Sequence, residues 1–306
     1  MTETEALLAE TGRTRLLVLD SGVGGLAYIR RLLRIRDAYT ICYLADTAGF
    51  PYGEKDPEWL RGHIVHLVGR ALLQFPADMV LIACNTASVS ALAALRATYD
   101  IPFVGTVPAV KPAAHLTRSG VIGLLATSAT VGDDYTDRLV AEFAAHFTVI
   151  RSGAPELVRK IEGGFPHLSE TAEVEELLRR ELFDFAEARA DVVVLGCTHF
   201  LHITPLLERV AKRLGNKLQL VDSLDGVARR VVELTHRDQR ATVTGFGRAL
   251  VKPGRSGGAR RTGLTEPAKG LLLTTRYDSR GAVADHRRYV GIGESFGLRY
   301  VGELSL

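Results

Sequence analysis

The sequence has 306 residues and a net charge of +3 at pH 7, and it is long enough for one large domain or two of about 100–150 residues. Apolar residues make up 46% and charged residues 24%, which is ordinary for a soluble globular protein, and no segment approaches the roughly 18 consecutive apolar residues that span a bilayer. Three cysteines give no disulfide framework and fit a reducing compartment, so we expect a cytoplasmic protein without a membrane partner.

Strands and helices are predicted to alternate through the first part of the chain. Residues 1–14 lack the basic and apolar regions of a signal peptide. The short apolar runs that follow are typical of parallel strands buried on both faces. In chain order we expect strand 15–19, helix 26–33, strand 39–44, helix 59–73, strand 79–83, helix 87–95 and helix 107–116.

The same alternation restarts after residue 119. In order we expect strand 120–125, helix 134–147, strand 148–150, helices 156–161 and 171–188, strand 192–195, helix 206–214, strand 217–221 and helix 226–235. Alternating strands and helices predict an α/β fold with a parallel sheet in each half, joined by right-handed crossovers.

The pattern fades in a basic tail that begins at about residue 241. Residues 237–306 hold 13 Lys and Arg against 6 Asp and Glu, a net charge of +7, whereas the preceding residues sum to −4. Residues 252–261 form a glycine-rich basic linker, and 270–275 and 298–301 resemble short strands around the polar run 285–289. Such a tail can bind nucleic acid, but a solvated extension is the simpler interpretation, and nucleic-acid binding is not expected.

An internal repeat is the most informative feature of the chain. Residues 77–86 align without a gap with residues 190–199, at an offset of 113 residues. Each copy is a predicted strand that ends on a cysteine, Cys84 in the first and Cys197 in the second, where open α/β sheets place their ligands. The repeat predicts two similar half-molecules whose thiols act on one atom from opposite sides.

The two cysteines could also have other roles. A single cysteine is more often a small buried hydrophobe, as we expect for Cys42 within its strand. Cys84, Cys197 and His199 could make three zinc ligands, but the spacing matches no common zinc site and no fourth ligand suggests itself, so no metal is predicted. Because each cysteine opens a helix, whose N-terminus favours the thiolate, we predict reactive thiols.

A glycine-rich turn follows the first strand. Gly22, Gly24 and Ala27 formally match a dinucleotide-binding fingerprint, with the acidic Asp46 24 residues after Gly22. That interpretation leaves the cysteine repeat and the Pro-Tyr-Gly loop at 51–53 unexplained. The favoured alternative makes the turn a cradle for a small anion, with Asp20 and Ser21 pointing into a cleft. We therefore predict no nucleotide cofactor.

Several polar residues near the predicted strand ends could take part in the chemistry. His199 follows Cys197 by two residues and is interpreted as a proton partner of the thiol or of a substrate ammonium group. Glu162, before two glycines, would from sequence alone be a surface residue at the end of a helix. Plausible donors to carboxylate groups are Asn85, Thr86, Thr127, Thr130 and Thr198.

These motifs together resemble the glutamate branch of the cofactor-independent aspartate/glutamate racemase family, over roughly residues 16–230. The matching segments are 20–25, 46–47 with 51–53, 83–88, 196–199 and 221–223. Asn-Thr-Ala-Ser after the first thiol and Thr-His after the second are similar to the glutamate branch, whereas the aspartate branch would carry Glu after Cys-Thr.

The resemblance implies a racemase that needs no cofactor and moves a proton with two thiols. Cys84 would act on D-glutamate and Cys197 on L-glutamate, with Asp20 and His199 assisting and Glu162 near His199. The implied substrate-binding residues are Asp20, Ser21, Pro51, Tyr52, Gly53, Asn85, Thr86, Thr127, Thr130, Thr198 and His199.

Three segments depart from the family pattern. Ala154 stands where the family has Cys before the Glu-bearing helix, a small insertion occupies residues 200–207, and the tail is longer than the family core requires. The first two lie beside the expected site, where they could alter the substrate fit or the setting of Glu162.

We therefore predict two pseudo-symmetric α/β domains with the active site in the cleft between them. The first domain would comprise residues 1–108 and 217–306, and the second residues 109–216. The expected role is supply of D-glutamate for peptidoglycan. Alternatives left open are a racemase or lyase of the same fold for another small acid such as aspartate, and a binding module that uses the basic tail. The sequence allows a homodimer but does not indicate one.

Overall fold

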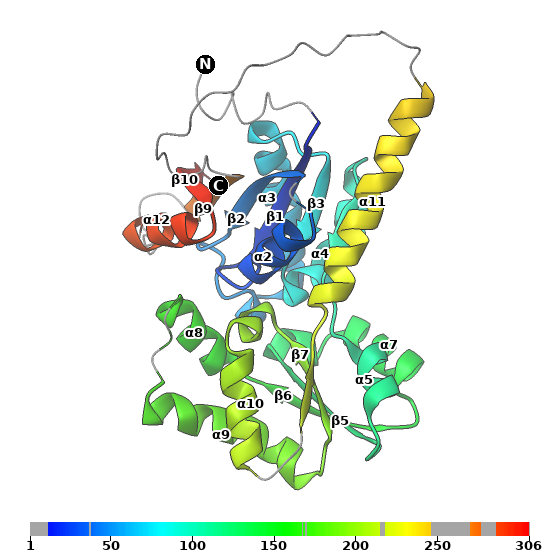
Figure 1. Ribbon diagram of the computed structural model, residues 1–306, viewed down its shortest axis with the longest axis vertical. Helices are drawn as coiled ribbons and strands as arrows, with labels where there is room; N and C mark the ends of the chain where they lie inside the picture. Colours follow the sequence, from blue (N-terminus) through cyan, green and yellow to red (C-terminus); the bar gives the residue numbers. More distant parts are fainter. Residues whose placement is uncertain are drawn as a thin grey trace, which may run out of the picture.

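Two parallel sheets, each covered by helices, make up the computed structural model of the chain (Figure 1). The structure describes residues 12–36, 38–166, 168, 170–214, 218–245, 270–276 and 286–305. The linker predicted at 252–261 lies outside these residues. Within the described part of the chain, no helix is long and apolar enough to cross a membrane.

The first sheet has the strand order β10-β9-β2-β1-β3-β4, and all its pairs are parallel. Its strands are β1 Thr14–Asp20, β2 Tyr39–Ala45, β3 Met79–Ile82, β4 Phe103–Gly105, β9 Gly270–Arg276 and β10 Leu298–Ser305. Side chains of β1 alternate between its faces, with Leu16 and Val18 on one side and Leu17 and Leu19 on the other. Both sets are fully buried, which explains the unbroken apolar run.

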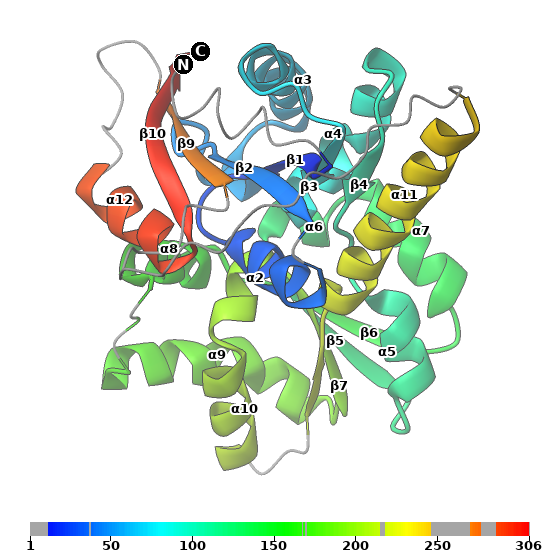
Figure 2. The ribbon, with the colours of Figure 1, turned by 45° about the horizontal axis from the view of Figure 1, so that its top comes forward.

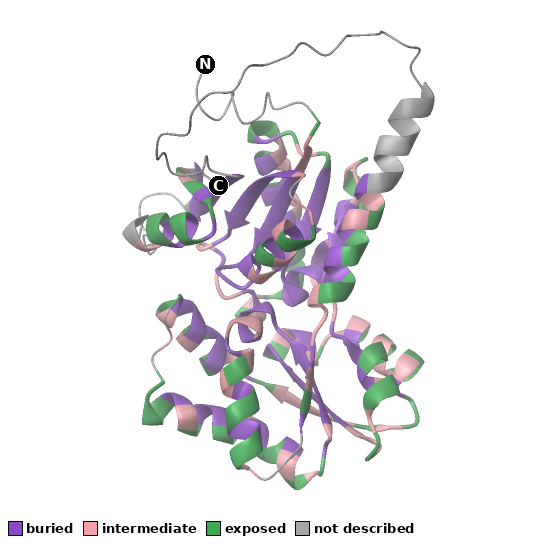
Figure 3. Cartoon of the chain, viewed as in Figure 1, coloured by how far each residue is buried: buried purple, intermediate pink, exposed green. Residues whose placement is uncertain are grey.

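Helices cover both faces of this sheet, so that the strands form a buried layer between them (Figure 3). One face packs against α2 Leu26–Ile35, α11 Leu224–Gly245 and α12 His286–Ser295. The other packs against α3 Pro57–Gln74 and α4 Asn85–Thr98. The start of α3 follows from its sequence, because the Asp56 side chain accepts hydrogen bonds from the amides of Glu58 and Trp59 and Pro57 occupies the first turn.

The second sheet has the order β6-β5-β7-β8 and is also parallel. Its strands are β5 Val121–Ala126, β6 Thr148–Gly153, β7 Val192–Gly196 and β8 Gln219–Val221. The helices α8 Pro155–Gly164, α9 Ala172–Glu187 and α10 Thr204–Arg213 cover one face, and α5 Val110–Leu116 and α7 Asp134–Phe143 the other. The α/β class and the two parallel sheets expected from the sequence are confirmed.

The internal repeat corresponds to matching positions in the two sheets. Cys84 follows β3 as the residue before α4, and Cys197 follows β7 as the residue before the short 3-10 helix η2 Thr198–His202. Both cysteines keep extended backbone angles, so each is the last extended residue of its strand. The carboxyl edges of the sheets therefore carry one thiol each.

Some elements differ from those expected. Strand β8 pairs with β7 in the second sheet, although the division made from sequence assigned residues 217–306 to the first domain. A run of three residues does not reveal which sheet it joins, because only the pairing partner decides that. Strand β4 was not expected, and the polar run 285–289 begins the helix α12. The tail strands β9 and β10 extend the first sheet beyond β2.

We expect Phe185→Ala to lower the free energy of unfolding by about 3–5 kcal/mol, since it empties a fully buried position of α9. The Phe185 ring lies so close to β5 that a Cβ at Gly123 would be 2.8 Å from it. The matched control is Phe183→Ala in the same helix, which is 49% exposed and should change stability by less than about 0.5 kcal/mol. Urea denaturation measures both, and equal losses would contradict this packing.

Candidate active site

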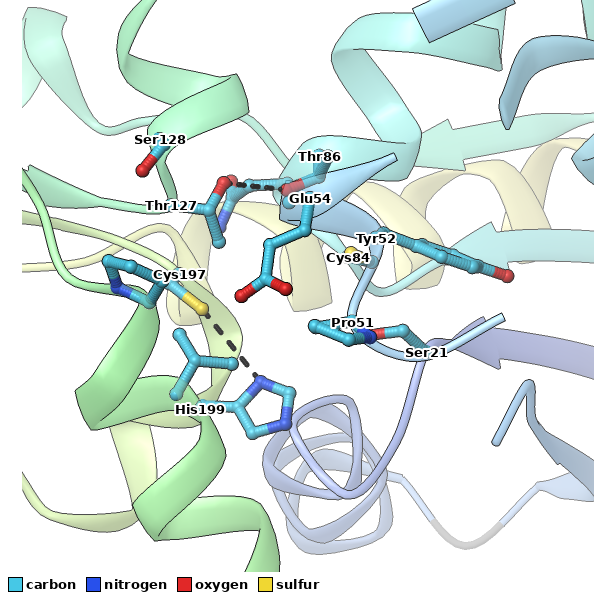
Figure 4. Close-up of a pocket in the computed structure, with 14 residues that line it drawn as sticks. Ser21, Pro51, Tyr52, Glu54, Cys84, Thr86, Thr127, Ser128, Cys197 and His199 are labelled. Carbon is cyan, nitrogen blue, oxygen red and sulfur yellow. Dashed lines mark hydrogen bonds between the residues drawn. The ribbon is translucent and has the colours of Figure 1, made fainter. Parts of the chain in front are cut away.

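One cavity lined by residues of both halves of the molecule contains the two repeat cysteines (Figure 4). Its free volume is about 20 Å³, enough for about one water molecule, so the cavity walls lie close together. The cavity is lined by Ser21, Pro51, Tyr52, Gly53, Glu54, Cys84, Asn85, Thr86, Thr127, Ser128, Pro155, Val158, Cys197 and His199. Ten of these were singled out from the sequence, whereas Glu54, Ser128, Pro155 and Val158 were not.

The two repeat cysteines reach this cavity from different halves and have different surroundings. Cys84 is 6% exposed; burial, and after it the charge of Asp20, raises the pKa of its thiol well above the ordinary value. Cys197 is 5% exposed, and its Sγ lies 3.8 Å from His199 Nδ1 (Figure 4). One thiol thus lies near a carboxylate and the other beside an imidazole.

His199 and Glu162 continue the line of contacts behind Cys197. His199 Nε2 lies 2.9 Å from Glu162 Oε2, which also accepts a hydrogen bond of 2.9 Å from the amide of Val23. Burial would lower the pKa of His199, but its hydrogen bonds with Cys197 and Glu162 raise that pKa well above 6.5. The arrangement favours an imidazolium next to the Cys197 sulfur.

Glu162 is buried, with 7% of its surface exposed, although its sequence position suggested a surface site. Burial opposes its ionisation, yet the hydrogen bond and charge of His199, the Val23 amide and Arg288 together lower its pKa. Tyr289 Oη donates to Glu162 Oε1 at 2.8 Å, and an Arg288 nitrogen lies 3.3 Å from the same oxygen. Both residues come from the tail, where sequence analysis found no role.

The insertion after His199 supplies a residue, His202, that contacts the turn next to Glu162. His202 Nε2 lies 2.9 Å from the carbonyl oxygen of Val23, the residue whose amide binds Glu162. Its ring packs 4.5 Å from that of Phe165, and burial lowers the pKa of His202 to about 4. A neutral His202 therefore donates to Val23 and supports the turn that carries Glu162's partner.

Asp20 lies behind the cavity, completely buried at the end of β1. Its carboxylate accepts hydrogen bonds from the amide of Gly22 at 2.8 Å and from Thr198 Oγ1 at 3.0 Å. Burial raises the pKa of Asp20 to about 6, against the lowering effects of His199 and of these two donors. Asp20 is thus a carboxyl group able to exchange a proton near neutral pH.

Two threonines and an asparagine line one wall of the cavity, and Thr130 lies buried behind them. Thr86 Oγ1 lies 2.9 Å from Thr127 Oγ1 and 3.1 Å from Thr130 Oγ1, and Thr127 also accepts the amide of Thr130 to cap the helix α6 Ser128–Val131. Asn85 Oδ1 is buried, and no hydrogen-bond partner for it is found among the described residues. These groups offer hydroxyl and amide donors of the kind that bind carboxylates.

The Pro-Tyr-Gly loop is held by a second buried carboxylate. Tyr52, in the short helix η1 Tyr52–Glu54, donates its hydroxyl to Asp46 Oδ2 at 2.6 Å, and His63 Nε2 lies 2.5 Å from the same oxygen. Thr275 of β9 binds the other oxygen. Burial alone would raise the pKa of Asp46, but the hydrogen bonds of His63, Thr275 and Tyr52 lower it. Asp46 therefore holds Tyr52 in position through this hydrogen bond.

The glycine-rich turn is filled by protein rather than open to a ligand's phosphates. A Cβ at Gly22 would lie 2.2 Å from Glu162 Oε2, and one at Gly24 would lie 2.3 Å from Thr198 Oγ1. The glycines thus permit close approach of the second half to the end of β1. This geometry accounts for the motif without a dinucleotide.

The comparison with protein families agrees with this geometry. The family model described as Asp/Glu/Hydantoin racemase matches residues 20–231, which include Asp20, both cavity cysteines and Glu162. The chain belongs to this racemase family. The resemblance stated from the sequence motifs is thereby confirmed.

Curated relatives of this family member are glutamate racemases. The one from Sphingopyxis alaskensis is 44% identical over 224 residues, which cover 72% of this chain and 81% of the relative. The one from Photorhabdus laumondii is 39% identical over 244 residues, covering 78% and 81%. Among solved structures, Escherichia coli glutamate racemase in complex with L-glutamate and the activator UDP-MurNAc-Ala is similar with a TM-score of 0.76 and 30% identity, covering 96% of this chain and 98% of that chain.

The raised pKa of Asp20 predicts that the free energy of unfolding depends on pH. The pKa of Asp20 is about 6 in the folded protein and near 3.9 when unfolded, so the folded state binds the proton more tightly. Stability should therefore fall as pH rises from about 4 to 6, by about 3 kcal/mol at most, and stay lowered above that window. Asp20→Asn should remove this penalty and be most stabilising, relative to the parent, at pH 8.

Urea denaturation of the parent and the variant between pH 4 and pH 8 measures this difference. The gain in stability from Asp20→Asn should shrink as the pH falls toward 4, where the parent carboxyl is protonated in the folded state. A difference that does not vary with pH would show that Asp20 is not ionised at a cost in the folded protein.

Proposed function

We propose that this protein is a glutamate racemase that interconverts L- and D-glutamate with two cysteine bases. The observation that carries the proposal is that Cys84 and Cys197, at matching strand ends of the two sheets, line one cavity. Family membership and the names of the curated relatives support it, as does the similar solved enzyme in complex with L-glutamate.

In the proposed reaction, the Cys197 thiolate removes the α-proton of L-glutamate while the Cys84 thiol delivers a proton to the opposite face. The roles exchange for D-glutamate. A thiol with an ordinary pKa of about 8.5 must ionise a far weaker carbon acid, so the developing negative charge needs fixed donors in a site shielded from water. The buried polar groups of the cavity wall could supply these donors.

Each thiol has its own proposed assistant. On the Cys197 side, Glu162 would keep His199 positively charged, and this charge beside the sulfur would favour the thiolate before it removes the α-proton. On the Cys84 side, Asp20 would exchange protons with the thiol or the substrate ammonium group, consistent with its raised pKa near 6. The burial that raises the pKa of Cys84 suits a thiol that serves first as proton donor.

The substrate's carboxylates and ammonium group would be held by the polar wall and by the turns from both halves. The groups proposed to bind them are Asp20, Ser21, Pro51, Tyr52, Gly53, Asn85, Thr86, Thr127, Thr130, Thr198 and His199. The buried, unpartnered Oδ1 of Asn85 is a candidate acceptor for the ammonium group. The Thr86, Thr127 and Thr130 hydroxyls are candidate donors to a carboxylate.

The wider setting is part of the same proposal. The enzyme would work in the cytoplasm without a cofactor and would supply D-glutamate for peptidoglycan. Its two domains would move relative to each other to admit substrate, with the first formed mainly by residues 1–108 and the tail, and the second by residues 109–216 together with β8. The protein could also assemble as a homodimer.

The activity is tested by incubating the purified protein with L-glutamate in D₂O without added cofactor. We expect D-glutamate to form with solvent deuterium at Cα, because the proton delivered by the second thiol comes from solvent. NMR and chiral chromatography measure both products. Exchange with aspartate but not with glutamate would replace the substrate, and no exchange with any small amino acid would reject the racemase proposal.

Substitution of the cysteines tests the mechanism. We expect Cys84→Ala and Cys197→Ala each to abolish racemisation, since each removes the proton donor or acceptor on one face of the substrate. The matched control is Cys42→Ala, because Cys42 is buried in β2 away from the cavity and should leave turnover unchanged. Substantial turnover in both directions by either cavity variant would exclude the two-thiol mechanism.

A further inference from the structure

Helix α12 of the C-terminal tail reaches across to the second half of the molecule at Glu162. Figure 2 shows α12 next to α8, the helix that carries Glu162. Tyr289 is only 2% exposed, and its hydroxyl donates to Glu162 Oε1 at 2.8 Å. Arg288 adds hydrogen bonds to the backbone carbonyl of Glu162 and to Oε1. The tail thus contacts the carboxylate behind Cys197.

The two oxygens of Glu162 have separate sets of partners. Oε2 faces His199 Nε2 and the amide of Val23, both at 2.9 Å, whereas Oε1 faces Tyr289 and Arg288. A carboxylate held on both oxygens cannot rotate about its terminal bond without losing donors. The Tyr289 contact therefore keeps Oε2 directed at the imidazole.

The direction of Oε2 determines which nitrogen of His199 faces the thiol. With Nε2–H donating to Glu162, Nδ1 points to Cys197 Sγ at 3.8 Å. Burial and the charge of Glu162 raise the pKa of Tyr289 well above 10, so its hydroxyl stays protonated and remains a donor. A carboxylate held in place behind a histidine fixes the orientation of the ring, as in other histidine–carboxylate pairs.

We propose that Tyr289 is a positioning residue for proton transfer at Cys197, acting through Glu162 and His199. The inference rests on the proposed racemase function, but neither the family match, which ends at residue 231, nor the names of the relatives assign a role to the tail. It explains why a polar segment far along the chain is packed against the site. It also gives the tail a part in one half of a two-base reaction.

The first test is a double-mutant cycle between Tyr289→Phe and Glu162→Gln. Tyr289→Phe keeps the ring and removes the hydroxyl, and we expect it to lower kcat about tenfold with little change in KM, the scale of one hydrogen bond to a charged group. If Tyr289 acts through Glu162, adding Tyr289→Phe to Glu162→Gln should cause almost no further loss. Independent, multiplying losses would overturn the proposal.

The second test separates positioning from general loss of structure. With α-deuterated L-glutamate, the primary isotope effect on L-to-D turnover should rise in Tyr289→Phe, because removal of the proton by Cys197 becomes slower. With α-deuterated D-glutamate, whose proton is removed by Cys84, the effect should stay equal or fall. A variant that is merely less well folded would lower both rates and leave both isotope effects unchanged, which would also overturn the proposal.

The matched control is Tyr99→Phe, which removes a hydroxyl that donates to the backbone carbonyl of Val65 at 2.8 Å, away from the cavity. It should leave kcat and both isotope effects unchanged. Thermal melting checks that each variant is folded. If the parent protein does not racemise glutamate, the proposed function fails; if the parent is active but the cycle is additive, only the role of Tyr289 fails.

Discussion

The arrangement of the site depends on the hydrogen bonds that the buried carboxylate of Glu162 accepts. This carboxylate accepts hydrogen bonds from the turn after β1, from η2 and from α12, segments that are far apart in the chain. Such a carboxylate is stable in the interior only because its donors compensate for lost hydration. Removing one partner therefore affects the others, and the turn, the imidazole and the tail helix are held as a unit around Cys197.

The candidate site contains three buried carboxylates, whereas a core built only for stability is mostly apolar. Asp20, Asp46 and Glu162 are all buried, and each is bound by several donors. For Asp46 and Glu162 these donors outweigh burial and lower the pKa, whereas for Asp20 burial prevails and raises it to about 6. The first two carboxylates thus position neighbours, while the third is suited to exchanging protons. The difference follows from the number and charge of the partners, and not from burial alone.

The departures from the family pattern do not disturb the contacts that join Glu162, His199 and Cys197. Ala154 precedes α8, and Glu162 at the other end of that helix still contacts His199. Arg159 of the same helix pairs with Glu54 at the cavity, so an ion pair joins the two halves there. The insertion after His199 supplies His202, which supports the Val23 turn. Each change is balanced by a local contact.

The sequence by itself determined the strand-end cysteines, the polar residues beside them and the α/β class. These depend on local patterns: an apolar run ends, a cysteine follows, and a helix begins within the same ten residues. Only the tertiary structure decided the sheet that β8 joins, the burial of Glu162 and the contact of α12 with Glu162. The first depends on the pairing of β8 with β7, and the other two depend on contacts between residues 23, 162, 199 and 289. No local pattern of hydrophobicity or turn chemistry encodes which distant segments will meet.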